Sequence, residues 1–212
     1  TKRFKTGNNI RVKGEDVKKK QRIFLSGRKI RSMDLAQLSA IGVKKIKVFK
    51  KIRVGIFSSG DELCEFPKKK SKYEIYDANK LVLVSLFKKI GCEVNDLGII
   101  KDNYSETRKL ILNKIKLLDV IITSGGISKS KTDKIGKFFE NNAQIKFWRL
   151  SIKPGRPFAF GKIKNTPFIG LPGNPVAAII TFFMLVIDYI KVLSGLKEKQ
   201  TIERILPCDF EM

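Results

Sequence analysis

Residues 119–128 have the sequence DVIITSGGIS, and this stretch decides the fold class. Three β-branched apolar residues and a threonine, at positions 120–123, predict a strand that is buried on both faces, as in a parallel sheet. The two glycines predict a tight turn, and residues 131–141 have the apolar spacing of a helix. A buried strand, a glycine turn and a helix together form the repeating unit of an α/β fold.

Strand and helix signals alternate on both sides of this stretch. Upstream, we expect strands at residues 53–57 and 92–100 and helices at residues 79–90 and 104–117. Downstream, a long helix beginning at Asn174 follows three extended segments. These segments lie at residues 145–152, 158–161 and 167–171. The pattern predicts an α/β domain in which a mostly parallel sheet lies between two layers of helices, a three-layer architecture.

We expect one main domain at residues 51–196, flanked by two partial segments. Residues 1–50 are polar and rich in lysine, and apart from a short helix expected at residues 33–41 they cannot form a core of their own. Residues 197–212 start like a strand and are expected to begin a further domain. Because the chain starts at Thr1 and stops within this strand signal, we expect both ends to be cut.

The formal net charge is +24, from 44 basic and 20 acidic residues. Such a charge favours polyanions in general, including nucleic acids, acidic membranes and phosphorylated small molecules. Codon drift in a genome poor in G and C would produce the same composition. The lysine runs at residues 18–20 and 68–70 lack the interleaved aromatic residues of a base-stacking surface, so we expect no specific nucleic-acid partner.

Cysteine usage and hydropathy indicate a reducing, cytoplasmic setting. Cys64, Cys92 and Cys208 form no CxxC pair, so they suggest neither a disulfide framework nor a structural zinc site. The longest apolar run, at residues 176–187, is shorter than the roughly 20 residues that a membrane-spanning helix needs. We therefore expect a buried core helix there and no membrane partner.

Polar residues and glycines follow each of the first three predicted strands, which is where an open parallel sheet binds its ligands. They are Ser58, Ser59, Gly60, Asp61 and Glu62 after the first strand, Lys101 and Asp102 after the second, and Ser124, Gly125, Gly126, Ser128 and Asp133 after the third. Backbone N–H groups at residues 124–128, beside a helix dipole, favour a phosphate. A plain tight turn is the alternative.

Carboxylates beside a phosphate-binding loop favour a bridging Mg²⁺, which typically takes one or two protein carboxylates together with phosphate oxygens and water. Asp102 and Asp133 are the candidate ligands. Each has an alternative structural role: Asp102 could cap the helix that follows it, and Asp133 could complement a helix dipole.

Two proline-rich corners complete the candidate residues. Their members are Lys153, Pro154, Gly155, Arg156 and Pro157 in the first, and Pro172, Gly173, Asn174 and Pro175 in the second. Lys153 and Arg156, on a stiff loop, could hold a small oxyanion through charge-assisted hydrogen bonds. Asn174 is expected as a helix N-cap, with Pro175 in the first helical position. Both corners could also be connections only.

Six motifs stand in the order seen in the molybdopterin molybdenumtransferase family, and nearly the whole chain resembles that family. They are RVGIFSSGDEL, IYDAN, GCEVNDLGIIKDN, DVIITSGGIS followed by Asp133, KPGRPFAFG and GLPGNPV. Residues 1–50 resemble the connecting segment just upstream. The resemblance implies a transferase that hydrolyses adenylylated molybdopterin, inserts molybdate into its dithiolene and releases AMP, with Mg²⁺ helping.

The resemblance also implies roles for residues at the matching positions. Functional acidic residues are implied at Glu62, Asp102 and Asp133, pocket prolines at Pro172 and Pro175, and a basic oxyanion loop at residues 153–157. The serines, glycines and Asp61 beside them are expected to bind the substrate. Arg156 stands where the family usually has lysine, which keeps the charge but changes the hydrogen-bonding geometry.

Three departures from the family pattern bear on activity. Lys129 and Ser130 stand where the family usually has Val-Gly, and a serine would be strained in a conformation that needs glycine. Ala177 replaces a common serine. The family's upstream aspartate and threonine belong to a domain that precedes residue 1. Since family members dimerise and share each site between subunits, we expect a homodimer of the full-length protein and an inactive half-site in this chain alone.

Two other classes of function fit part of the sequence. A molybdopterin adenylyltransferase would share the glycine loop and several carboxylates, but it is a single domain and would not carry residues 1–50. The other class is a non-catalytic role, either as a scaffold, as in the gephyrin member of the family, or as a module that binds polyanions by charge. No groove-entering motif accompanies the charge, so the transferase is favoured.

Overall fold

The computed structural model describes residues 5–127 and 134–197 of the chain. These residues form two units, one made of residues 5–48 and 195–197 and the other of residues 49–194. The second unit contains the sheet and all the described residues that the sequence predicts for the site.

The larger unit is built on a six-stranded sheet in the order β4-β1-β5-β8-β7-β6. Its strands are β1 (Arg53–Ser59), β4 (Glu93–Ile100), β5 (Val120–Ser124), β6 (Ala143–Arg149), β7 (Pro157–Ile163) and β8 (Thr166–Leu171). The strands β4, β1, β5 and β8 pair in parallel, and β7 is antiparallel to both of its neighbours. The predicted mostly parallel sheet is confirmed.

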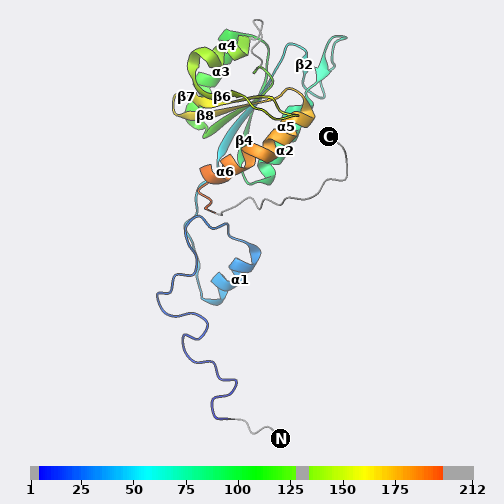
Figure 1. Cartoon of the computed structure of the whole chain (residues 1–212). Coiled ribbons are helices and arrows are strands. Elements are labelled where there is room, and N and C mark those ends of the chain that lie inside the picture. The colour runs from blue at the N-terminus through cyan, green and yellow to red at the C-terminus, as the bar shows by residue number, and fades with distance from the viewer. Residues whose placement is uncertain (1–4, 128–133, 198–212) are drawn as a thin grey trace, which may run out of the picture. The chain divides into compact units, whose positions relative to one another are not determined.

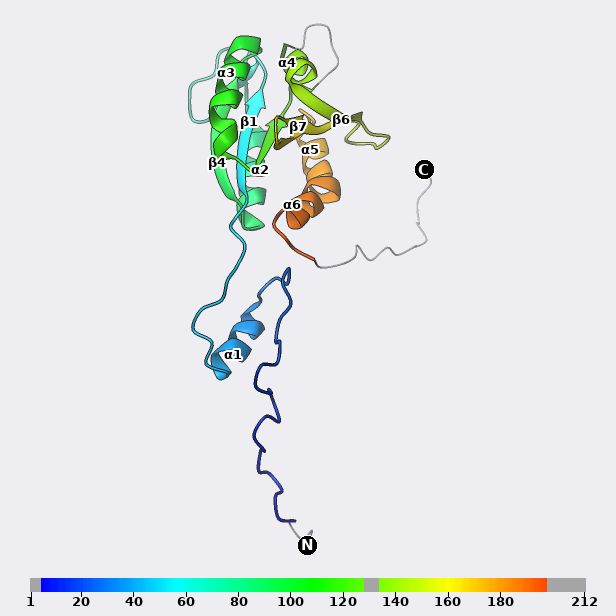
Figure 2. The same cartoon turned by 90° about the vertical axis from the view of Figure 1, so that its left-hand side faces the viewer.

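Helices cover both faces of this sheet, which gives the three predicted layers (Figure 1 and Figure 2). One layer contains α2 (Ala78–Lys89) and the continuous helical segment α5 (Pro175–Thr181), η2 (Phe182–Val186) and α6 (Ile187–Leu193). The other layer contains α3 (Tyr104–Lys114), the 3₁₀ turn η1 (Ile115–Leu117) and α4 (Lys134–Asn142). The α/β class follows from this arrangement.

Two apolar cores lie on the two faces of the sheet. Successive residues of a strand point to opposite faces, so Ile121 of β5 enters one core and Ile122 enters the other. In the core beneath α2, the rings of Phe87 and Phe182 meet edge to face, with 5.0 Å between their centroids. Burial also raises the pKa of the Cys92 thiol, in the same core, to about 11. The continuous apolar run of β5 thus reflects burial on both faces.

The helical segment Pro175–Leu193 is longer than the apolar run at its centre. Among the described residues it is the one helix that is long and apolar enough, by length and composition, to cross a membrane. The expectation that the apolar run is too short for this is therefore wrong once the whole helix is considered. Core helices pass the same test. Phe182 and Val186 are buried against the sheet, whereas Phe183 and Met184 are more than half exposed. The predicted core helix is therefore buried on one face only.

The smaller unit contains α1 (Ser32–Ala40), which confirms the short helix expected at residues 33–41. Asp34, in the first turn, is buried and accepts hydrogen bonds from the Arg28 guanidinium (2.6 Å) and the Arg31 backbone N–H (2.9 Å). Leu38 is the buried apolar residue of this helix. With so few buried side chains, the described part of this unit has no core comparable with that of the larger unit.

Candidate functional site

A pocket of about 610 Å³ lies at the carboxyl ends of β1, β4 and β5. Ten residues that the sequence predicts for the site line it. They are Ser59, Gly60, Asp61, Glu62, Asp102, Ser124, Gly125, Gly126, Gly173 and Pro175. Parallel strands bring their carboxyl ends to one edge of a sheet, which explains why segments so far apart in the sequence meet here.

The glycine turn after β5 closes tightly on the end of β1. Gly125 and Gly126 have φ angles of +82° and +64°, which non-glycine residues rarely adopt. An added Cβ would lie 2.6 Å from the Ser59 carbonyl oxygen at Gly125 and 2.6 Å from the Ser59 hydroxyl at Gly126. The Gly125 N–H donates to the Leu171 carbonyl at 3.1 Å. This N–H therefore joins the turn to the end of β8 and does not face an anion.

Asp102 lies inside the pocket and does not cap the helix that follows it. Its Oδ1 accepts a hydrogen bond from the Ser59 hydroxyl at 3.3 Å, and its N–H donates to Asp61 Oδ1 at 2.9 Å. The N-cap of α3 is Asn103, whose side chain accepts from the N–H groups of Ser105 and Glu106. The alternative structural role for Asp102 is therefore wrong.

Glu62 folds back over Gly60 at the edge of the pocket. Gly60 has a φ angle of +155°, and a Cβ added there would lie 2.6 Å from Glu62 Oε2. The Leu63 N–H donates to the Gly60 carbonyl at 3.3 Å, which closes the turn between them. The missing side chain at position 60 thus leaves the space that the Glu62 carboxylate occupies.

Asn79 is a pocket residue that the sequence analysis missed. Its Nδ2 donates to the Ser124 hydroxyl and to the Gly173 carbonyl, both at 2.7 Å. Asp77, two residues earlier, also lines the pocket and caps α2 by accepting from the Lys80 N–H. The sequence did contain a signal for these two residues. Both belong to the motif IYDAN at residues 75–79, which is part of the family resemblance but was given no role in the site.

The pocket is acidic although the chain as a whole is strongly basic. Four of its lining residues are carboxylates, namely Asp61, Glu62, Asp77 and Asp102, and none of the described lining residues is a lysine or arginine. No cluster of three or more metal-ligating side chains occurs within residues 5–127 and 134–197. A cation in this pocket would therefore depend on ligand oxygens as well as on the carboxylates, as Mg²⁺ sites commonly do.

Residues 55–192 match the family model described as "Probable molybdopterin binding domain". The chain belongs to this molybdopterin-binding family. A molybdopterin molybdenumtransferase of Haemophilus influenzae is 41% identical to it over 194 residues, which cover 92% of this chain and 48% of that protein. A molybdopterin molybdenumtransferase of Nostoc sp. is 31% identical over 196 residues, which cover 91% of this chain and 45% of that protein.

Solved structures of the same kind share the fold. The crystal structure of a molybdopterin biosynthesis MoeA protein from Pyrococcus horikosii superposes with a TM-score of 0.76 at 29% identity, covering 87% of this chain and 46% of that one. The chain therefore spans about half the length of the relatives that it matches.

The basic loop predicted to hold an oxyanion does not line the pocket. Lys153 and Arg156 are exposed, and a Cβ added at the buried Gly155 would lie 2.6 Å from Thr181 Cγ2, so the loop packs closely on α5. Pro154 and Pro157 are likewise absent from the pocket lining. The role of this loop in binding an oxyanion remains a prediction.

The second proline-rich corner is divided between the pocket and the helix that follows. Gly173 and Pro175 line the pocket, whereas Pro172 is buried beside it and Asn174 is turned to α5. Asn174 accepts a hydrogen bond from the Ala177 N–H at 3.1 Å, which confirms the predicted N-cap with proline at the start of the helix. The remaining predicted site residues, with the loop positions that depart from the family, lie outside the described residues: Ser128, Lys129, Ser130 and Asp133.

Proposed function

We propose that this chain acts in molybdenum cofactor biosynthesis by binding adenylylated molybdopterin in the pocket at the ends of β1, β4 and β5. The observation that carries the proposal is the convergence, in a molybdopterin-binding family, of the glycine turn, the two serines and the four carboxylates on one pocket of about 610 Å³. The names of the relatives support a molybdenumtransferase. The proposed reaction is the insertion of molybdate into the bound pterin with release of AMP.

The charge of the pocket supports a role for Mg²⁺. A ligand that carries phosphate is repelled by four carboxylates unless a cation lies between them. Asp102, which lines the pocket, is proposed as one protein ligand of such an ion, and Asp133, outside the described residues, as the second. When bound, Mg²⁺ would offset the phosphate charge and polarise the phosphoanhydride bond between the AMP phosphate and the molybdopterin phosphate, which is the bond that must break for AMP to leave.

The side chains around the ion would orient the ligand. Ser59 and Ser124 lie at the pocket wall, where the Ser59 hydroxyl donates to Asp102 Oδ1 and the Ser124 hydroxyl accepts from Asn79, so the two serines would fix the side chains that surround the ligand. Ile75 and Tyr76, which are 58% and 41% exposed, offer apolar surface on which a pterin or adenine ring can lie. Glu62 is proposed to act on the reacting phosphate, and Lys153 and Arg156 to hold molybdate, in a cytoplasmic homodimer whose second subunit completes the site.

Calorimetric titration of the protein with adenylylated molybdopterin tests the proposal. We expect binding that is at least about tenfold tighter in Mg²⁺ than in EDTA, because the ion offsets the repulsion between phosphate and carboxylates. A duplex DNA titration is the control for binding driven by the net charge. Binding to DNA alone, falling steeply with salt, would contradict the proposal and favour a polyanion-binding module, and so would the absence of any pterin binding.

A further inference from the structure

One segment of the chain, residues 60–77, forms nearly half of the pocket wall, and we call it the pocket arm. It runs from the end of β1 to the N-cap of α2 and contains the short parallel strands β2 (Leu63–Cys64) and β3 (Ile75–Tyr76). The arm lies outside the six-stranded sheet. Backbone hydrogen bonds hold β2 against β3 within the arm, and side chains from the main body of the unit attach the arm to the sheet.

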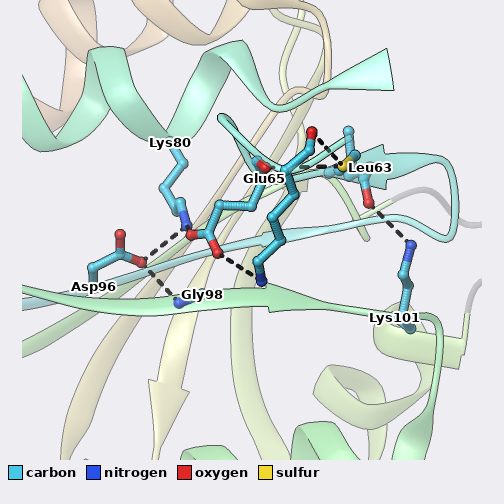
Figure 3. Close-up of polar contacts among 8 residues, drawn as sticks. Leu63, Glu65, Lys80, Asp96, Gly98 and Lys101 are labelled. Carbon is cyan, nitrogen blue, oxygen red and sulfur yellow. Dashed lines mark hydrogen bonds and ion pairs between the residues drawn. The ribbon is translucent and has the colours of Figure 1, made fainter. Parts of the chain in front are cut away.

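Lys101, which follows β4, donates hydrogen bonds to the pocket arm on both sides of Glu62. Its Nζ donates to the carbonyl oxygen of Leu63 at 3.0 Å (Figure 3). It also donates to the carbonyl oxygen of Asp61 at 2.7 Å and lies 3.5 Å from the Glu74 carboxylate. An ammonium group has three N–H donors, and these three acceptors match them in number. The main chain on either side of Glu62 is thus tied to the end of β4.

The neighbouring residue strengthens this connection. The Asp102 N–H donates to Asp61 Oδ1, so the Lys101-Asp102 dipeptide contacts the turn at Asp61 through both a side chain and the backbone. The same dipeptide places the Asp102 carboxylate in the pocket. Two of the pocket carboxylates, on Glu62 and Asp102, therefore take their relative position from one short stretch of chain.

We propose that Lys101 is a positioning residue of the pocket, which fixes the main chain on both sides of Glu62 and so sets the position of the Glu62 carboxylate relative to Asp102. The proposal rests on the proposed function in one respect, because it takes Glu62 to act on the bound ligand. It adds a residue that is not among those lining the pocket.

A second lysine, Lys80, also contacts the pocket arm, but at a different place from Lys101. Lys80 of α2 is only 8% exposed and pairs with Glu65 at 2.7 Å and Asp96 at 3.3 Å, which joins the arm to α2 and β4 (Figure 3). Lys101 is 47% exposed, and ion pairs at such positions contribute little stability. The buried lysine therefore attaches the arm, while Lys101 orders the turn that carries Glu62.

Hydrogen exchange of single backbone amides, followed by NMR, tests the positioning without any ligand. The informative amides are those of Ile75, which donates to the Glu62 carbonyl at 2.8 Å, and Asp102, which donates to Asp61. We expect them to exchange about tenfold faster in Lys101→Met, because methionine fills the same space but donates nothing. Lys101→Arg should restore slow exchange.

Two outcomes of the exchange experiment would overturn the proposal. One is unchanged exchange of the Ile75 and Asp102 amides in Lys101→Met. The other is equal acceleration of amides in β5, such as that of Ile121, because it would show that Lys101 supports the whole fold. Lys191→Met is the matched control, since it removes an exposed lysine that pairs with Asp188 on α6, and it should leave the pocket arm unchanged.

A double-mutant cycle then tests whether Lys101 acts through Glu62. We expect Lys101→Met to weaken binding of adenylylated molybdopterin about tenfold in the wild-type background but less than about twofold in Glu62→Gln. Equal weakening in both backgrounds would overturn the proposal. If the wild type binds no pterin, the proposed function fails, and the exchange data alone decide whether Lys101 orders the turn.

Discussion

Asn79 donates a 2.7 Å hydrogen bond to the hydroxyl of Ser124, and this bond joins the first turn of α2 to the end of β5. The same amide group reaches the Gly173 carbonyl in the corner before α5. Three segments that form the pocket are thus fixed to one another by one side chain. All three residues line the pocket, so the loss of these bonds should change both the stability of the site and its affinity for a ligand.

Asn79→Ala should lower the free energy of unfolding by about 1–3 kcal/mol, because two hydrogen bonds are lost and Gly173 and Ser124 lose their donor. Urea denaturation measures this change. Asn79→Asp is the more specific test, because a carboxylate has the same shape as the amide but cannot donate a hydrogen bond. We expect Asn79→Asp to be at least as destabilising as Asn79→Ala. Wild-type stability in Asn79→Asp would show that the two bonds are unimportant.

Gly60→Ala should abolish most ligand binding while leaving the chain folded. The added methyl group would lie against the Glu62 carboxylate and would also strain the backbone, at a cost of about 1–3 kcal/mol. Gly91→Ala is the matched control, because Gly91 also has a positive φ angle, +90°, but no atom lies within 4 Å of its added Cβ. The control should lose stability and keep affinity. Equal affinity in both variants would argue against a role for Glu62.

Removing Lys80 and removing its two carboxylate partners should lower the free energy of unfolding by different amounts. Burial by itself lowers the pKa of Lys80, but the carboxylates of Glu65 and Asp96 outweigh it and raise the pKa overall. Removing both carboxylates, in Glu65→Gln/Asp96→Asn, leaves a buried charge unpaired and should cost about 3 kcal/mol of unfolding free energy. Lys80→Met should cost less, since both carboxylates are more than 40% exposed and can be hydrated. Denaturation midpoints in the reverse order would contradict this account.

The ion pair between Arg53 and Asp119 should contribute to stability only above acidic pH. Hydrogen bonds from the Arg53 guanidinium and backbone hold the pKa of Asp119 below its ordinary value of 3.8. A lowered pKa in the folded state stabilises the protein above pH 3.8, and this contribution is lost as the pH falls through the folded-state value. The stability difference between wild type and Asp119→Asn should thus be present at neutral pH and shrink under acid. A constant difference across this range would be inconsistent with the pair.

The sequence predicts the sheet well because burial on both faces leaves a local signal. The apolar run of β5 and the glycines after it are visible without any knowledge of their neighbours. Asn79 could not be predicted in the same way, since its partners lie 45 and 94 residues away. The burial of Lys80 could not be predicted either, because a lysine on a helix is usually solvated. Its burial depends on the ion pairs with Glu65 and Asp96.

The long helix illustrates a different limit. Its apolar residues occur on both faces, so their periodicity does not show which face meets the sheet, and only the structure separates the buried Phe182 from the exposed Phe183. The basic loop at residues 153–157 was predicted to bind an oxyanion from its charge and from the family resemblance, and neither gives its distance from the pocket. Its packing against Thr181 depends on tertiary contacts.

The measurement that tests the central claim most directly is the Mg²⁺ dependence of adenylylated molybdopterin binding in the wild type and in Asp102→Asn. Asp188→Asn, which changes an exposed carboxylate on α6, is the control. We predict that Mg²⁺ tightens binding about tenfold or more in the wild type and in the control, and has little effect in Asp102→Asn. The same Mg²⁺ dependence in all three proteins would contradict the assignment of the substrate and its ion to this pocket.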